Sequence, residues 1–468
     1  MVKNFIVSIT RNMTSLIGTA LAVASLILIL SLFAIQQFGF AGSPYLGILT
    51  YLILPMILVA GLILIPIGAV LWRRKMNRLP GGEDIPLMPV FDLNVSKTRN
   101  WLLIFLAATM VNIIILSTAT YKGVEVMESV EFCGLACHSV MEPEHTAHHR
   151  SAHSRVSCAQ CHIGPGADWF VKSKLDGTWQ LIAVAFDLYP RPIPTPLHDL
   201  RPARDTCEQC HWPTKFVGDK LSIRKHYDDD EKSTELTTAL LLRVGGSDAS
   251  GSSGIHWHVD PNVKVRYRSD ETREQIYEVE YTDSDGVVTE FHDRKAPKEG
   301  GVWRTMDCVD CHNRPSHTYQ PPDNEIDKAI TAGLIDRKLP FIKRESLRII
   351  DAKYDSHEAA RMAISNQLKQ FYADNYPQEA EENAAAISAA ADALGDIYSV
   401  NVFPQMKVWW NTYPNHLGHE QSPGCYRCHK KSMRTKERIS ISRDCDTCHV
   451  LLAEEEENPE IMSTLNPE

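Results

Sequence analysis

The sequence predicts a mainly α protein in which three transmembrane helices precede an exported domain with little regular structure. The first observation is that the 468-residue chain has no charged residue and no histidine between Asn12 and Trp72. The second is another uncharged stretch from Asn100 to Tyr121. The third is that all 12 cysteines follow Tyr121, in pairs that each end in Cys-His. The 48 Lys and Arg residues stand against 58 Asp and Glu residues, which excludes a strongly basic nucleic-acid-binding protein.

The uncharged segments are long enough for three membrane spans. A single helix from Asn12 to Trp72 would be about 90 Å long, roughly three times the thickness of a bilayer core. We therefore expect the chain to turn at residues 39–44, where glycines, a serine and a proline cluster. The predicted spans are residues 15–38, 45–71 and 101–120, within a membrane anchor of residues 1–122.

The distribution of basic residues predicts the orientation of this anchor in the membrane. Six Lys and Arg residues lie between the second and third spans, whereas the turn after the first span has none. The positive-inside rule then places the N-terminus and the loop 73–99 in the cytoplasm, and everything after Tyr121 outside. A cleaved signal peptide is the alternative for the first span, but its apolar region is too long and no small-residue cleavage site follows it.

The cysteine pairs have the spacing of haem attachment sites. The first pair has three intervening residues, in Cys133-Gly134-Leu135-Ala136-Cys137-His138, and the other five read C-x-x-C-H. This motif attaches c-type haem, because two thiols reach the two vinyl groups on one porphyrin edge and the adjacent histidine reaches the iron. The regular motifs are Cys158-Cys161-His162, Cys207-Cys210-His211, Cys308-Cys311-His312, Cys425-Cys428-His429 and Cys445-Cys448-His449.

Three other uses of paired cysteines fit less well. A zinc ribbon pairs two C-x-x-C motifs but needs no histidine after each. A disulfide framework would not repeat the histidine, and a thioredoxin-like site would supply one motif. We therefore predict six covalently bound haem c groups, attached outside the cytoplasm. The predicted proximal iron ligands are His138, His162, His211, His312, His429 and His449.

Other histidines and two methionines could bind the second face of each iron. An electron-transfer haem usually takes its second axial ligand from His or Met, and Met gives the higher reduction potential. Ordinary hydrogen bonding or core packing is the alternative for each residue, and we expect it for His198, His292 and His357. The candidates are His145, His148, His149, His153, His226, His256, His258, His317, His416, His419, Met141 and Met433.

The segments between the motifs differ in character. Residues 264–294 alternate apolar and polar residues around an Asp285-Gly286 turn, which predicts a β-hairpin. Residues 247–253 are a Gly/Ser-rich connection, and residues 324–398 have a helical pattern with a break at Tyr376-Pro377. We therefore expect a hexahaem domain with a β-hairpin insertion and a helical insertion. Its predicted parts are residues 123–220 with haems 1–3, a β-rich insertion 221–305, residues 306–400 with haem 4 and the helices, and a dihaem region with an acidic tail, 401–468.

The chain resembles a known family in the order of its segments, because a membrane span is followed closely by the first haem motif. Together with Cys137-His138-Ser139-Val140-Met141 and the residues 156–162, this order resembles the NapC/NirT/NrfH family of membrane-anchored multihaem quinol dehydrogenases, from Trp101 to about Phe216. Residues 207–213, 254–258 and 306–308 resemble larger inner-membrane cytochromes of metal-respiring bacteria. The chain departs from the family in its three spans and in the extra residue of its first motif.

The resemblance implies a function, a location and a substrate site. Such proteins lie in the bacterial inner membrane with their haems in the periplasm, and they pass electrons from menaquinol to periplasmic cytochromes or other redox proteins. A lysine and an acidic residue just past the second motif help to bind quinol, and the matching residues are Lys172, Lys174 and Asp176. Ordinary surface charge is the alternative for these three residues.

Three functions are open at this point. The chain could be a quinol:cytochrome c oxidoreductase that draws on the quinone pool, or an electron-relay subunit that binds other subunits of a larger respiratory membrane complex. It could also be a terminal reductase of nitrite, hydroxylamine or a sulfur oxyanion, which needs an iron with an open face. The many spare histidines do not force an open iron, so we favour quinol oxidation. The acidic exported domain favours a basic redox partner.

Overall fold

The computed structural model of the chain divides into two compact units, Met1–Cys137 and His138–Glu468. About half of the chain is helical, and two antiparallel sheets are present. The expectation of little regular structure is therefore wrong. The structure describes residues 12–37, 49–78, 93–136, 138–164, 167–197, 200–212, 218–245, 254–297 and 299–465.

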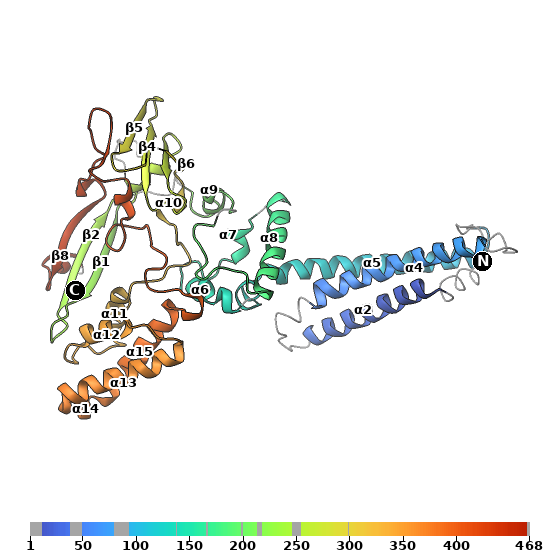
Figure 1. Ribbon diagram of the computed structural model, residues 1–468, viewed down its shortest axis with the longest axis horizontal. Coiled ribbons are helices and arrows are strands. Elements are labelled where there is room, and N and C mark those ends of the chain that lie inside the picture. Colours follow the sequence, from blue (N-terminus) through green and yellow to red (C-terminus); the bar gives the residue numbers. More distant parts are fainter. Residues whose placement is uncertain are drawn as a thin grey trace. The chain divides into compact units, whose positions relative to one another are not determined.

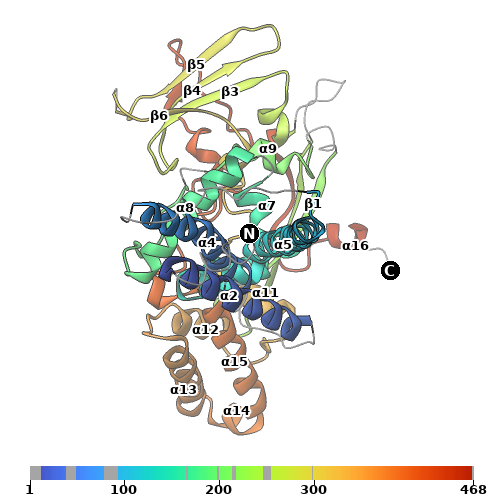
Figure 2. The same cartoon turned by 90° about the vertical axis from the view of Figure 1, so that its right-hand side faces the viewer.

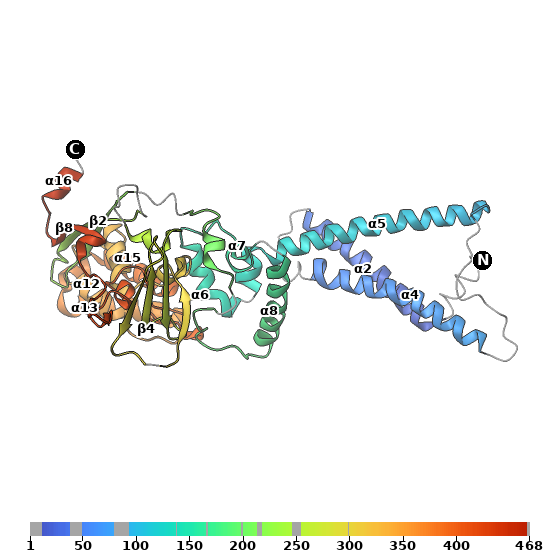
Figure 3. The same ribbon diagram turned by 90° about the horizontal axis from the view of Figure 1, so that it is seen from above.

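Three helices of the first unit are long and apolar enough to cross a membrane, as predicted. The helices α2 (Met13–Gln37) and α4 (Leu54–Asn77) lie side by side and cross (Figures 1 and 3). A five-residue π-helix, η1 (Leu49–Ile53), precedes α4. The turn predicted at residues 39–44 and the connection at 247–253 lie outside the described residues.

Two glycines allow the backbones of α2 and α4 to touch. A Cβ atom on Gly18 would lie 2.8 Å from the carbonyl oxygen of Gly61, and one on Gly61 would lie 2.7 Å from that of Gly18. The Ser15 hydroxyl donates a hydrogen bond of 2.7 Å to the Ile65 carbonyl across the same interface. Small residues and interhelical hydrogen bonds from hydroxyl groups are typical of packed membrane helices. Lipid tails are as apolar as the helix surfaces, so close packing and hydrogen bonds hold the helices together instead of the hydrophobic effect.

The third apolar helix, α5 (Ser96–Met127), begins earlier and ends later than the predicted span 101–120. Its last turns contain charged residues and therefore extend beyond the uncharged segment from which the span was predicted. Lys122 and Glu125 form an ion pair of 2.7 Å one helical turn apart, a spacing that supports a helix. A short π-helix, η2 (Phe132–Ala136), then carries the first cysteine of the first motif.

Two sheets form part of the second unit. The first has the order β1-β2-β8, and the second has the order β6-β3-β4-β5-β7. The strands predicted between residues 264 and 294 are present as β3, β4 and β5. The sequence analysis did not single out β1, β2 and β6, which lie almost entirely within the predicted β-rich insertion 221–305, and it missed β7 and β8. The strands are β1 (Lys220–Tyr227), β2 (Glu235–Leu242), β3 (Lys264–Ser269), β4 (Ile276–Thr282), β5 (Val288–Asp293), β6 (Val302–Thr305), β7 (Met433–Arg434) and β8 (His449–Glu456).

The helical part of the second unit lies away from the second sheet (Figure 2). Its helices enclose a core of fully buried side chains that includes Ile342, Ile364, Leu368 and Leu394. The helices therefore bury their own apolar faces without haem, which explains why regular structure is more extensive than expected. They are α11 (Pro322–Thr331), α12 (Ile342–Ile350), α13 (His357–Asn375), α14 (Pro377–Glu382) and α15 (Ala384–Asn401), with the predicted break at Tyr376-Pro377.

A buried charge cluster joins β1 to the helices α11 and α12. The side chain of Lys343 is 1% exposed, and its ammonium group lies 2.8 Å from Asp323 and contacts Asp327. The Nδ1 of His226 lies 2.8 Å from the carboxylate of Asp327. Burial raises the pKa of Asp327, and the Lys343 ammonium opposes that shift. His226, Asp323 and Asp327 are close enough to hold a metal ion, and the Lys343 ammonium group already contacts both carboxylates.

We predict that Lys343→Met destabilises the helices α11 and α12 by about 3–5 kcal/mol, because it leaves the Asp327 carboxylate buried without its cation. Amide hydrogen exchange of residues 322–350 in the full-length protein measures the loss. The control is Asp396→Asn, which breaks the exposed ion pair between Arg361 and Asp396 and should cost less than about 1 kcal/mol. Equal effects of the two variants would contradict this account of the cluster.

Candidate haem-binding site

The cysteines of the haem motifs lie on short helical turns. The second, third and fourth motifs begin or end the helices α7 (Cys158–His162), α9 (Ala203–Cys207) and α10 (Cys308–Cys311). The fifth and sixth use the 3-10 turns η6 (Gly424–Arg427) and η7 (Cys445–Thr447). In the first motif, Cys137 lies outside the described residues, and nothing is described of the His138 side chain.

Each histidine of the five regular motifs lies near a second histidine ring, and the angle between the two ring planes ranges from 2° to 78°. These partners come from other segments of the chain, and all five were candidates for the distal position. The distances between ring centroids are 6.2 Å for His162 and His317, 5.9 Å for His211 and His153, 6.3 Å for His312 and His256, 6.0 Å for His429 and His258, and 6.2 Å for His449 and His419.

This separation suits two histidines on opposite faces of one iron. A bond from a metal to a histidine nitrogen is about 2 Å long and the imidazole centre lies about 1 Å further on, so the two ring centroids should be roughly 6 Å apart. The residues present therefore fit a haem iron between each of the five pairs.

Hydrogen bonds at Nδ1 orient several of these rings. The Nδ1 of His153, His258 and His317 lies 3.3, 2.7 and 3.1 Å from the main-chain carbonyl oxygens of Pro315, Ile255 and Glu144. The Nδ1 of His256 contacts the Val244 carbonyl, and that of His429 lies 2.6 Å from the Ser442 carbonyl. An imidazole that donates through Nδ1 presents Nε2 to a metal, which is the usual arrangement in metal sites.

Burial shifts the pKa values of several of these histidines and cysteines. It lowers the pKa of His162, His258, His312 and His317, which favours the neutral imidazole that binds a metal. Burial also raises the pKa of Cys428 to about 11 and that of Cys311 to about 12.

Other histidines that were candidates for the distal position make different contacts. The Nε2 of His416 lies 2.8 Å from the Glu274 carboxylate, and His226 belongs to the Lys343 cluster. The His148 ring is 6.4 Å from that of His317, but its Nε2 lies 3.0 Å from the Val156 carbonyl. His145 and His149 face each other on α6 (His138–His149).

The two candidate methionines lie in apolar surroundings. Met433 is fully buried with Val265 and Tyr267 in the core of the second sheet. Met141 is partly buried against a cluster that contains Val140 and Tyr319. Of the residues expected to be structural, His357 lies 2.6 Å from the Val402 carbonyl and His292 lies beside Glu278, whereas His198 lies outside the described residues.

The candidate quinol-binding residues lie on helix α8 (Ala167–Ala185). Lys172 and Lys174 are partly buried and Asp176 is exposed. The Lys172 ammonium group lies 5.3 Å from the centre of the Trp169 ring. The large apolar side chains Leu175, Trp179, Ile182 and Phe186 of the same segment are exposed, the last of them to 72%. Helix α8 therefore combines basic groups with an extended apolar surface.

Sequence analysis missed two polar links between the motifs. Asp310, inside the fourth motif, is buried and accepts hydrogen bonds from Tyr267 and Arg273, the latter at 3.0 Å. Arg427, inside the fifth motif, donates to the main-chain carbonyl of Asp310 and, at 2.6 Å, to that of Arg273. A charged residue between the two cysteines of each motif is the sequence signal that could have drawn attention to Asp310 and Arg427, although the bond between them involves the main chain of Asp310.

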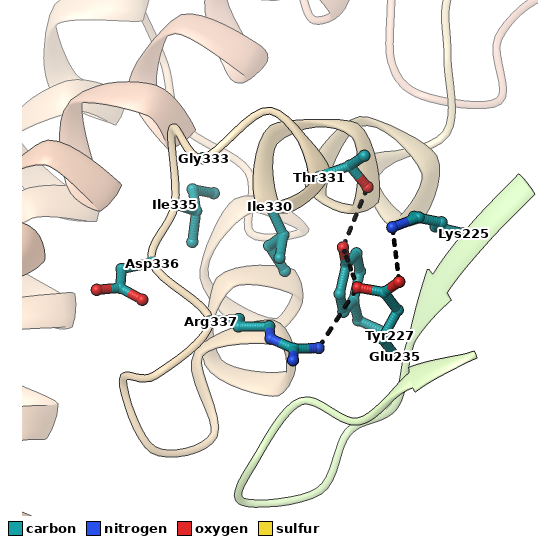
Figure 4. Close-up of a pocket in the computed structure, with 9 residues that line it drawn as sticks. All are labelled: Lys225, Tyr227, Glu235, Ile330, Thr331, Gly333, Ile335, Asp336 and Arg337. Atoms are coloured by element: carbon teal, nitrogen blue, oxygen red, sulfur yellow. Dashed lines mark hydrogen bonds and ion pairs between the residues drawn. The ribbon is translucent and has the colours of Figure 1, made fainter. Parts of the chain in front are cut away.

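A pocket of about 410 Å³ lies away from these histidines, between the β1–β2 hairpin and the helix α11 (Figure 4). The Glu235 carboxylate lies at its centre, 2.7 Å from the Lys225 ammonium and 3.4 Å from the Arg337 guanidinium. The Tyr227 hydroxyl donates to the same carboxylate at 3.2 Å. Because these groups satisfy one another and no haem ligand lines the pocket, we assign it no part in haem binding.

Comparison with known proteins agrees with this site. The model of the NapC/NirT cytochrome c family, N-terminal region, matches residues 95–190. The chain is 43% identical over 454 residues to the cytochrome c-type protein ImcH of Geobacter sulfurreducens, which covers 96% of this chain and 89% of the relative. No solved structure matches the chain. The chain therefore belongs to the NapC/NirT family of membrane-anchored multihaem c-type cytochromes.

Proposed function

We propose that the protein binds six haem c groups, oxidises menaquinol and passes the electrons to a periplasmic redox protein. The observation that carries this proposal is the set of five histidine pairs with ring centroids about 6 Å apart. The proposed distal ligands are His317, His153, His256, His258 and His419, for the second to the sixth motif in order. When bound, the haems supply one-electron transfer, and two histidine ligands favour a low potential.

The order of the motifs in space supports a relay. The Cys161 and Cys207 side chains lie close to each other, and so do those of Cys207 and Cys308. Cys311 is close to Cys425, which in turn is close to Cys448. Motifs that follow one another in the sequence, from the second to the sixth, are therefore neighbours in space.

The link between Asp310 and Arg427 fixes one step of this order. Arg427 is 8% exposed, and its guanidinium bonds to main-chain carbonyls of the fourth motif and of Arg273. Buried charge-assisted hydrogen bonds of this kind are each worth about 1.5–3 kcal/mol. The Arg427 side chain thus connects the fifth motif to the main chain of the fourth.

Helix α8 supports the assignment of the quinol site. A quinol has a polar ring and an apolar tail, and α8 offers charged groups next to exposed apolar side chains. We propose that Lys172 or Lys174 binds a quinol oxygen and that Asp176 accepts a proton. Oxidation of one quinol releases two protons and two electrons, and haems held by the paired histidines would accept these electrons one at a time.

The far end of the relay suits a basic partner. Cys445 of the sixth motif is exposed, and so are the neighbouring Asp444 and Asp446. The end of β8 and the residues after it add the exposed side chains of Glu454, Glu455, Glu456 and Glu457. An acidic surface attracts a positively charged protein and speeds its association at low salt. We propose that a basic periplasmic cytochrome docks at this surface.

A menaquinol analogue is expected to reduce the haems in proteoliposomes that contain only this protein, and a quinone-site inhibitor should block the reaction. Asp176→Asn and Lys174→Gln should each slow reduction roughly tenfold, because each removes a charge-assisted hydrogen bond. Stopped-flow absorbance of the haems measures the rate. Lys220→Gln, at an exposed lysine on β1, is the control. Absence of reduction by the wild-type protein would favour a relay subunit of a larger complex.

Replacement of a proposed distal ligand should change one haem. His256→Met is expected to raise the reduction potential of one haem and to leave the potentials of the other haems unchanged, because a thioether stabilises the reduced iron more than imidazole does. Near-infrared magnetic circular dichroism, together with a redox titration, would detect the new His–Met haem. The matched variant is His292→Met, at an exposed histidine beside Glu278, which should change nothing. A His256→Met protein with unaltered spectrum and potentials would refute the ligand assignment.

A further inference from the structure

The carboxylate of Glu144 lies against His317, the histidine that faces His162 of the second motif. The His317 Nδ1 is 3.0 Å from Oε2 of Glu144 and 3.1 Å from its main-chain carbonyl oxygen. The N–H is aligned with the carbonyl, so Oε2 is buried beside the ring without an aligned hydrogen-bond donor.

Arg314 holds Glu144 and His317 together. Its Nη2 lies 3.3 Å from Oε1 of Glu144, and its Nε donates a bond of 2.7 Å to the main-chain carbonyl of His317. The guanidinium group is 8% exposed and stacks 4.4 Å from the centre of the Tyr413 ring. Both ends of the contact between Glu144 and His317 are therefore fixed by one packed side chain.

The charge beside His317 distinguishes this histidine from other proposed distal ligands. The Nδ1 atoms of His153, His256 and His258 contact main-chain carbonyl oxygens. At His317 a carboxylate oxygen lies next to the carbonyl, 3.0 Å from Nδ1. A negative formal charge is therefore in direct contact with this imidazole.

We infer that Glu144 is a positioning residue that orients His317 and lowers the reduction potential of the haem attached at Cys158 and Cys161. The inference rests on the proposed function, because it takes His317 as the distal ligand of that haem. A negative charge at Nδ1 increases the electron density on Nε2, and a more basic ligand stabilises the oxidised iron. Arg314 keeps the carboxylate at the ring and prevents it from turning away.

The test is Glu144→Gln in the full-length holoprotein, which preserves the shape of the side chain and removes its charge. A redox titration followed by absorbance should show one haem shifted to higher potential, with the low-spin spectrum and the remaining potentials unchanged. Glu144→Asp retains the charge and should retain most of the low potential. Glu142→Gln, at an exposed glutamate on the same helix, is the matched control. Equal shifts in Glu142→Gln and Glu144→Gln, or no shift in either, would overturn the inference.

A double variant separates this inference from the ligand assignment. If His317 binds the iron, His317→Met raises the potential of one haem, and the shift caused by Glu144→Gln should be smaller in that background. An undiminished shift would show that Glu144 acts on another group, and would overturn the inference alone. A His317→Met protein with wild-type spectra would show that His317 is not a ligand, and would overturn the proposed pairing as well.

Discussion

The arrangement of the second unit depends on one constraint, which is that pairs of histidines must lie close enough to bind the same iron. The partners are far apart in the sequence, as for His162 with His317 and His429 with His258. An iron between each pair would act as a cross-link, and cross-links that close long loops restrict the unfolded chain most strongly. The fold must therefore bring distant loops together with errors well below the length of one metal–ligand bond.

The sheets and the buried polar links provide that precision. The 3-10 turn η4 (Ile255–Val259) carries both His256 and His258, which face the histidines of the fourth and fifth motifs. Strand β8 begins at His449 and pairs with β2, so the sixth motif is attached to the edge of a sheet. The Arg427 guanidinium then joins the fifth motif to the fourth. Regular structure in this unit thus serves to position loops.

Local sequence patterns predicted several secondary-structure elements, but they did not predict which distant residues pair. The apolar helices, the strands between residues 264 and 294 and the break at Tyr376-Pro377 each follow from a few adjacent residues, and the structure contains them. The partner of each motif histidine depends on which loops meet in space, so the sequence left twelve candidates for the distal position. The contact of Glu144 with His317 joins residues of α6 to a loop after α10, and no local pattern indicates it. The amount of regular structure was underestimated, because the helical core around Ile342 and Leu368 needs no haem to bury its apolar faces.

The most direct test of the account is an experimentally determined structure of the loaded protein, with the iron positions located by anomalous scattering. The account predicts an iron between the Nε2 atoms of each of the five histidine pairs, and irons of consecutive motifs as nearest neighbours from the second to the sixth. An iron whose second ligand is Met433, His226 or His416 would contradict the assignment. A different spatial order of the irons would contradict the proposed relay.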